Sequence, residues 1–414
     1  DVYSSLQGMA LDLPEPLYKK TTQNIPLGIT LGLAGRRSGF VRLRYGHALK
    51  VISQQEGLLG KLQRMALQFD DEREPQLPEQ EAIHVSGNVK RLDWGQWQQL
   101  LQSTSDADEP DLQLPLIVRL QRLHVTAEAG STNSEGGGGL QRLPQLDLHI
   151  KDFSYKGMPF GEVSLRVEPQ ERRAEIQDVS VVANNFVLQG KGRWDYGGKS
   201  RFQLELHSES LGNMLSDLGY ASVISDGKTR SSIDAKWSGS PLQFSLAGLE
   251  AKGRVEIEEG VIHEVKAGAG KLLGLLSLQA LPRRLFLDFS DLSGEGLRFN
   301  SIKGDLTLRN GNAYTENMLL KALPADVLVT GRTGLVARDY DQLVIVVPQV
   351  SDTVSVAGAL AWGPQVAAAL ILLQKIFKSD IDAATMIRYS VTGSWEKPQI
   401  RQLDRVAPAE GEQR

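Results

Sequence analysis

The sequence predicts a mostly β protein built on an elongated, largely antiparallel sheet. Apolar and polar residues alternate with period two over many short runs, the pattern of strands with one apolar and one polar face. Glycine-containing turn dipeptides separate many of these runs. No regular helix lies between them, which excludes a doubly wound α/β fold. A few short helices are expected, mainly near the C-terminal end.

The clearest run is GEVSLRVE at residues 161–168, where every second side chain is apolar. Four further runs repeat the pattern: RFQLELHS (201–208), PLQFSLAG (241–248), RVEIEEG (254–260) and DLTLRNG (305–311). Their apolar residues are the candidate lining of one sheet face: Val163, Leu165, Val167, Phe202, Leu204, Leu206, Leu242, Phe244, Leu246, Val255, Ile257, Leu306 and Leu308. Residues 40–46, 116–125, 145–150 and 343–348 are predicted strands of the same kind.

Turn signals agree with this strand assignment. The dipeptides NG at 310–311, GG at 197–198 and DG at 226–227 favour tight hairpins, as does RSG at 37–39. Two short helices are also predicted. Asp93 would cap the first, and Ser210 would cap the second, which ends at Gly219.

Two longer apolar helices are expected in the last third of the chain, within 266–281 and 364–387. The second is apolar almost all round, so something must cover it. Its candidate membrane- or partner-contacting residues are Val366, Leu370, Ile371, Leu373, Lys375, Phe377 and Lys378. The lysines could meet lipid phosphates. A plug that protects the last strands from edge pairing explains the helix equally well.

Composition shifts suggest how the chain is divided. Residues 126–144 are rich in Gly and Ser and predict a flexible loop, and 71–82 and 104–111 are acidic loops that contain proline. We therefore expect the segments 1–125, 126–144, 145–262, 263–404 and a tail, 405–414. Two β-sandwich domains joined near 126–144 are the alternative.

Composition and motifs also exclude several functions. The net charge of −4 gives no field to attract nucleic acid. The chain has no cysteine, which removes disulfides, thiolate metal sites and cysteine nucleophiles. The six histidines show no metal-ligand spacing, and GAGKLLG (268–274) lacks the spacing of a phosphate-binding loop. We expect no catalytic residue, no metal and no cofactor, and therefore no enzyme.

The longest apolar stretch, residues 366–377, is too short to span a bilayer as a helix. Because the sequence starts at Asp1 without Met or a signal peptide, we expect a piece of a longer protein or a processed form.

Four motifs of the last third resemble the YhdP branch of the AsmA-like family: GAGKLLGLLSLQALPRRLFLDFSDL (268–292), SIKGDLTLRNGNAYTENMLL (301–320), RDYDQLVIVVPQV (338–350) and VTGSWEKPQI (391–400). The resemblance covers roughly 240–404 well and 1–240 more loosely, through DVYSSLQGMALDLPEPL (1–17) and the strand pattern. It implies a periplasmic protein, anchored in the inner membrane by an N-terminal helix absent here, that moves phospholipid between inner and outer membranes.

Periodicity alone favours a β-sandwich, in which the apolar faces are simply the core. The resemblance favours instead a twisted sheet curled into an open apolar groove that carries glycerophospholipid. On this interpretation the chain is monomeric, and the C-terminal helix could contact the outer membrane. The competing function is a periplasmic scaffold that binds envelope proteins through its sheet edges without carrying lipid.

Overall fold

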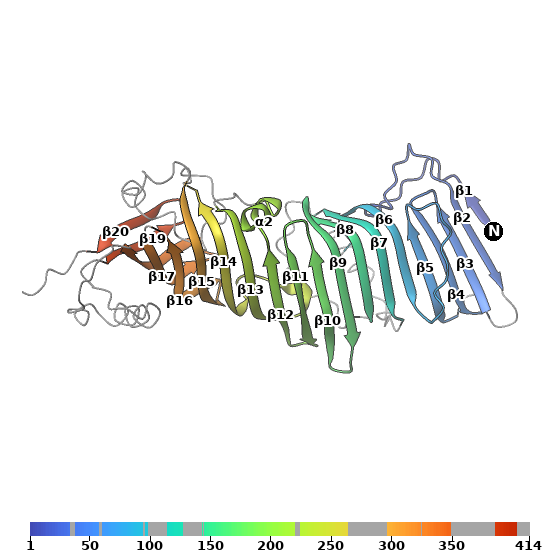
Figure 1. The fold of residues 1–414 in the computed structure, drawn as a ribbon. Helices are drawn as coiled ribbons and strands as arrows, with labels where there is room; N and C mark the ends of the chain where they lie inside the picture. The colour runs from blue at the N-terminus through green and yellow to red at the C-terminus, as the bar shows by residue number, and fades with distance from the viewer. Residues whose placement is uncertain are drawn as a thin grey trace, which may run out of the picture. The chain divides into compact units, whose positions relative to one another are not determined.

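A computed structural model describes residues 1–33, 38–57, 60–93, 96–97, 114–126, 143, 145–219, 224–263, 296–323, 325–348 and 386–403. Within these ranges twenty strands belong to one largely antiparallel sheet, accompanied by a short α-helix (Figure 1). The predicted fold class, mostly β and largely antiparallel, is confirmed.

The chain divides into two compact units. Unit 1 comprises Asp1–Ser200 with Gly239–Gln243, and unit 2 comprises Arg201–Ser238 with Phe244–Arg414. Each is described by itself below. The segment boundaries predicted at 126–144 and 262–263 stay predictions.

Unit 1 contains the first eleven strands of the sheet. They are β1 (Val2–Ser4), β2 (Leu27–Leu33), β3 (Ser38–Tyr45), β4 (Leu49–Glu56), β5 (Leu62–Phe69), β6 (Ile83–Asp93), β7 (Leu116–Thr126), β8 (Leu146–Tyr155), β9 (Met158–Pro169), β10 (Arg173–Val182) and β11 (Val187–Asp195). Each strand pairs with the next along the chain. Seven of these pairs are antiparallel, and short connections join the two strands in all of them except β1–β2, whose strands are separated by residues 5–26.

The other three pairs of unit 1 are parallel: β5–β6, β6–β7 and β7–β8. In a parallel pair, the chain must return to the end of the sheet at which the first strand began before the second strand can start. The return segments include the three stretches predicted as loops. Residues 71–82 lie between β5 and β6 without regular secondary structure. The stretches 104–111 and 126–144 lie almost entirely outside the described residues.

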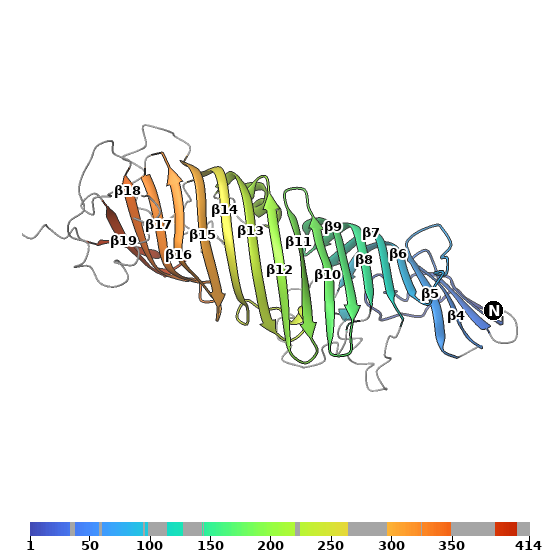
Figure 2. The same ribbon diagram turned by 60° about the horizontal axis from the view of Figure 1, so that its bottom comes forward.

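Unit 2 contains the remaining strands and most of β12. They are β12 (Lys199–Ser208), β13 (Ile224–Ser238), β14 (Glu250–Ile262), β15 (Leu297–Arg309), β16 (Asn312–Ala322), β17 (Ala325–Gly334), β18 (Asp339–Pro348), β19 (Ile387–Ser394) and β20 (Pro398–Leu403). From β13 onward each strand pairs antiparallel with the next, and Figure 2 shows β13 to β16 side by side.

Turn chemistry explains one predicted hairpin and corrects another. Asn310 and Gly311 both have positive φ, 51° and 69°, and join β15 to β16 as the NG dipeptide predicts. Asp226 and Gly227 also have positive φ, but they lie inside β13. The DG dipeptide therefore distorts a continuous strand, and the hairpin predicted there is wrong.

The strand predicted at 241–248 is also wrong. Residues Pro241–Gln243 form a 3-10 helix, and turns follow before β14 begins at Glu250. Pro241 has no N–H to donate to a strand ladder. The Gln243 side chain accepts a hydrogen bond from the Ser240 N–H at 2.9 Å, which closes the chain locally. Alternation across 241–248 therefore reflects a loop that carries apolar side chains.

The short helix predicted after Ser210 is confirmed, and the one predicted after Asp93 is described only at Gln96 and Trp97, which are helical. Helix α2 (Leu211–Asp217) begins after Ser210, whose side chain accepts from the Asn213 N–H. Asp93 accepts from the Gln96 N–H at 3.0 Å, as an N-cap does. The longer helices predicted within 266–281 and 364–387 lie outside the described residues, except that Ile387 already belongs to β19.

Candidate functional site

Strand register in unit 1 aligns apolar residues from nine neighbouring strands, β2 to β10, in one row across the sheet. Each member lies directly opposite the next in the pairing of adjacent strands, so all point to the same face. The row is Ile29, Leu43, Val51, Leu67, Val85, Val118, Leu148, Leu165 and Val179. A parallel row through Val163 contains Ile150, Leu120, Phe69 and Leu49. We call this surface the apolar face of unit 1.

The row is only partly covered. Eight of its nine members are half-buried, and Val118 alone is buried, at 8% exposure. The three candidates on β9 separate in the same way, because Val163 and Leu165 are half-buried whereas Val167 is 1% exposed. A soluble protein seldom leaves a continuous apolar surface of this length accessible unless something binds to it.

The reverse face of the same strands is polar. The row beside the apolar one runs through Arg44, Lys50, Gln68, Ser86, Arg119, His149, Ser164 and Ser180. Arg119 pairs with Asp147, and the hydrogen bond from the guanidinium lowers the pKa of that carboxyl. One face can therefore hold apolar ligand atoms while the other carries polar side chains, of which Lys50 and Gln68 are buried.

The N-terminal segment covers part of the apolar face at β2 to β5. Leu6, Leu11, Leu17 and Ile25 pack in one cluster with residues of that face, among them Leu49. Two polar contacts attach the segment to the rest of unit 1. The Tyr45 hydroxyl donates to the Leu17 carbonyl at 3.2 Å, and the Trp97 indole N–H donates to the Glu15 carbonyl at 2.9 Å.

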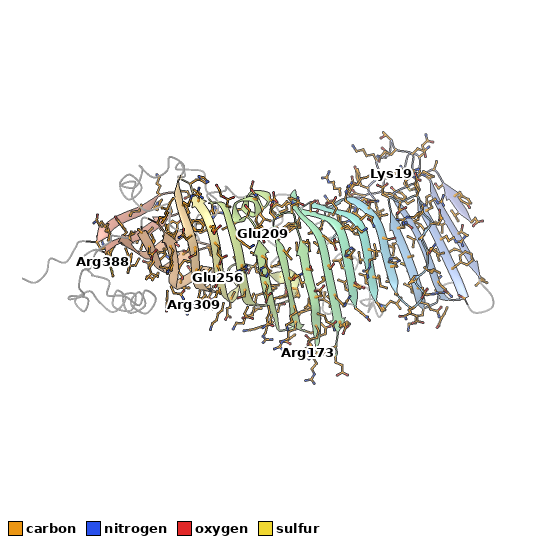
Figure 3. All side chains as sticks on the ribbon, viewed as in Figure 1. Lys19, Arg173, Glu209, Glu256, Arg309 and Arg388 are labelled. Carbon is orange, nitrogen blue, oxygen red and sulfur yellow. The ribbon has the colours of Figure 1, made fainter. Side chains whose placement is uncertain are left out.

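Lys19 stabilises this segment from within. It is fully buried, and its ammonium group donates to the backbone carbonyls of Met9 at 2.7 Å and Lys20 at 3.1 Å (Figure 3). Leu11 and Lys19 also form an antiparallel bridge. The segment is thus a defined loop that covers one end of the nine-strand row.

In unit 2 an apolar face is partly accessible on β14 and β15 and is covered where the row of Ile257 continues to β18. Val255, Leu306 and Leu308 are half-buried on this face, and Ile257 is 3% exposed. Ile257 lies opposite Ile302, and the row continues through Leu320, Val327 and Val346, all at most 1% exposed. The reverse face changes from Lys303 on β15 to the buried Leu319, Leu328 and Ile345 on β16 to β18.

Three aromatic rings meet where β13 ends. The rings of Phe202 and Trp237 stack with centroids 5.1 Å apart, and Phe244 meets Trp237 edge-on at 5.3 Å. Trp237 is 9% exposed and packs in one cluster with Ala251 and Leu308 of the apolar face. The loop that carries Phe244 is therefore attached to the face.

The remaining candidate residues lie on several different elements. Leu204 and Leu206 are half-buried on β12. Leu246 is 47% exposed in the loop before β14. Leu242 belongs to the 3-10 helix. The candidates of the C-terminal helix, Val366 to Lys378, lie outside the described residues.

A cavity of about 930 Å³ lies on the polar side of β2 to β4, with Arg42, Arg44, Lys50 and Glu74 in its wall. Lys50 donates to the carbonyls of Glu72 and Arg73 at 2.7 and 2.9 Å and lies 3.3 Å from the Glu74 carboxylate. These cations are largely satisfied by the protein itself. The charged wall does not suit acyl chains.

Within the described ranges, no three acidic or histidine side chains gather as a metal site would require. In the same part of the chain, no helix has the length and apolar character needed to cross a bilayer.

Sequence reasoning missed much of the apolar face. Leu43, Val118 and Leu148 lie in predicted strands, but they are not among the predicted lining residues. Trp237 was missed as well, although Ile233, Ala235 and Trp237 alternate along β13. The sequence shows the alternation within each strand, which could have identified these residues. It does not show the pairing between strands that aligns them in one row.

Comparison with known proteins identifies the family of this chain. The family model described as "YhdP protein" matches residues 1–122 and 106–400. The chain is 32% identical over 264 residues to the intermembrane phospholipid transporter YhdP of Escherichia coli (strain K12), an alignment that covers 63% of this chain and 21% of that relative. The match thus spans about a fifth of the relative's length. No solved structure matches. The family match spans nearly the whole chain, and the chain belongs to the YhdP family.

Proposed function

We propose that this chain carries phospholipid by holding acyl chains against its apolar face, without chemical conversion. The observation that supports this most strongly is the nine-strand row from Ile29 to Val179, apolar at every position yet half-buried at all but one. The polar reverse face would keep the sheet hydrated. The headgroup would remain in water while the tails lie on the sheet.

Transfer energies explain why a carrier needs such a surface. A phospholipid has about thirty CH₂ groups, and at ~0.8 kcal/mol each their full exposure to water costs on the order of 25 kcal/mol. Apolar contacts are non-directional, so a lipid can slide from one strand to the next without a fixed binding geometry. A continuous row suits movement, whereas a closed pocket suits storage.

The relative named above is an intermembrane phospholipid transporter, which motivates the proposed location. We place this chain in the periplasm of a Gram-negative envelope, where the full-length protein would be anchored in the inner membrane and would supply phospholipid to the outer membrane. This role would support the lipid balance and barrier function of the outer membrane. The competing role is a periplasmic scaffold that carries no lipid.

Organic extraction of the purified chain, followed by mass spectrometry, separates the two roles. Stoichiometric glycerophospholipid is expected, and Leu165→Asp should remove most of it because a carboxylate then stands in the middle of the row. Ser164→Asp, on the polar side of the same strand, is the matched control and should retain the lipid. A clean extract from the unchanged chain contradicts carriage and favours the scaffold.

A further inference from the structure

In unit 2, four connections lie on the same side of the sheet, where the strands end. They are the connections after β13, β15, β17 and β19, and we call the side that they form the docking edge. This follows from the topology, because consecutive strands from β13 to β20 pair antiparallel and every second connection returns to the same side. The connection after β16 begins at the opposite edge. The two edges can therefore be compared within one unit.

The first edge presents apolar side chains to solvent. Phe244 is 52% exposed, Leu246 47% and Val336 58%. None of them lies on a strand, so strand alternation does not account for their exposure. Large apolar residues gathered on neighbouring loops mark a surface that binds a partner.

Backbone contacts join these connections into one surface. The Leu335 N–H donates to the Gly311 carbonyl at 2.8 Å, which links the β17–β18 turn to the β15–β16 turn. A methyl group at Gly311 would stand only 2.7 Å from Val336 and 3.8 Å from the backbone of Ala247. The Trp395 N–H donates to the Arg338 carbonyl at 2.9 Å, which adds the β19–β20 turn.

Cations surround the exposed apolar residues. Arg309, the last residue of β15, is exposed, as are Arg338 and Lys397 on the neighbouring turns, and Figure 3 shows Arg309 at this edge. Arg309 lies over the ring of Tyr314 at 4.7 Å. Among the described residues no carboxylate lies within ion-pair distance of any of the three. Asp339 is already paired with Arg332, and Glu396 is the exposed acid beside Lys397.

The docking edge is continuous with the apolar face of unit 2. Phe244 contacts Trp237 edge-on, and Trp237 packs with Ile233, Ala251 and Leu308 on the face. An acyl chain leaving a surface at Phe244 would therefore meet apolar side chains without crossing a polar barrier. Turns with exposed apolar tips between unpaired cations are the chemistry that an anionic phospholipid surface recognises.

We propose that this edge, formed by Phe244, Leu246, Arg309, Val336, Arg338 and Lys397, docks onto the surface of an anionic phospholipid bilayer. The apolar tips enter the interface and the cations face the lipid phosphates. Acyl chains then pass over Phe244 and Trp237 between bilayer and apolar face, a step that rests on the proposed carriage. Docking itself requires only the edge.

Flotation with phosphatidylglycerol–phosphatidylcholine vesicles tests the docking. The unchanged chain should float with these vesicles and should float much less with vesicles of phosphatidylcholine alone. The double variant Arg338→Gln, Lys397→Gln should weaken vesicle partitioning about fivefold per lost cation. The double variant Phe244→Ser, Leu246→Ser should also reduce flotation.

Two matched controls lie elsewhere in unit 2. Leu323→Ser changes a residue that is 71% exposed at the opposite edge, and Arg298→Gln with Lys321→Gln removes two exposed cations near that opposite edge. Both controls should float normally. If the edge variants float as well as the controls, the docking is contradicted, and the edge would then serve a protein partner.

Lipid extraction from the same variants keeps the two proposals distinguishable. Edge variants should retain the glycerophospholipid bound on the apolar face, whereas Leu165→Asp should lose that lipid and still float. An unchanged chain that contains lipid but does not float with anionic vesicles contradicts docking alone. A chain that floats through its edge but yields no lipid contradicts carriage alone.

Discussion

Trp237 of β13 stacks on Phe202 of β12 with the two ring planes 2° apart and their centroids 5.1 Å apart. Alternation predicts Phe202 as a lining residue but does not predict its partner, Trp237. The pair joins two strands of unit 2 on the apolar face and supports the loop that carries Phe244. The packing of this aromatic cluster should therefore dominate the stability of this part of the sheet.

Trp237→Ala should destabilise unit 2 by about 3–5 kcal/mol, because it removes a 9% exposed indole from between Phe202 and Phe244. Urea unfolding followed by far-UV circular dichroism measures the change. Phe244→Ala is the control and should cost under ~1 kcal/mol, because that ring is 52% exposed. An equal cost for both substitutions would show that Trp237 is not the centre of the cluster.

Leu165 and Val167 lie on the same face of β9 but differ in burial, so they predict different responses to charge. Val167→Asp places a carboxylate where only 1% of the side chain is exposed and should destabilise by several kcal/mol. Leu165→Asp, at a half-buried position, should leave a cooperative unfolding transition at nearly the unchanged midpoint. Thermal melts decide the matter. A large fall in the melting temperature of both variants would identify the row as a closed core.

Lys19→Met retains the aliphatic body of the buried side chain but removes its two hydrogen bonds to carbonyls. Hydrogen bonds from a charged donor outweigh its desolvation when they are well made, so we expect a loss of about 1–3 kcal/mol. Lys20→Met, at an exposed position, is the control and should be neutral. Chemical denaturation measures both. A more stable Lys19→Met variant would mean that burying the charge costs more than its contacts return.

Asp339 and Arg332 form two hydrogen bonds of 2.8 Å, and the guanidinium lowers the pKa of the carboxyl below its usual value of 3.8. A carboxyl with a lowered folded-state pKa stabilises the fold above its unfolded-state pKa, and the contribution is lost as pH falls through the folded value. Asp339→Asn should therefore cost about 1 kcal/mol at pH 7, since solvent screens the partly exposed pair.

The stability difference between the unchanged chain and Asp339→Asn should shrink as the pH falls below about 4, because Asp339 of the unchanged chain then becomes protonated. Urea midpoints of the two proteins at pH 7 and pH 3 provide the comparison. A difference that is as large at pH 3 as at pH 7 would assign the effect to packing or to the amide itself.

Much of the strand content could be predicted because period-two alternation is a local property. Val163, Leu165 and Val167 share a face for geometric reasons, whatever β9 pairs with. The Asn310–Gly311 turn and the Ser210 cap follow from local backbone chemistry in the same way.

The rest depends on contacts between segments far apart in the sequence. Alternation cannot say that Leu67 lies opposite Val85 in a parallel pair, because register is set between strands. It cannot separate the half-buried Leu165 from the buried Val167 either, since burial depends on what covers each position. At 241–248 it failed outright, because Pro241 and local hydrogen bonds oppose a ladder.

Site-specific photocrosslinking on β9 tests the central claim most directly. A photoreactive side chain replaces either Leu165 on the apolar face or the adjacent Ser164 on the polar face. The protein is then irradiated in intact Gram-negative cells. Adducts are identified by mass spectrometry. Carriage along the apolar face predicts phospholipid adducts at Leu165 and none at Ser164. Equal labelling at both positions, or no lipid adduct at Leu165, would contradict it.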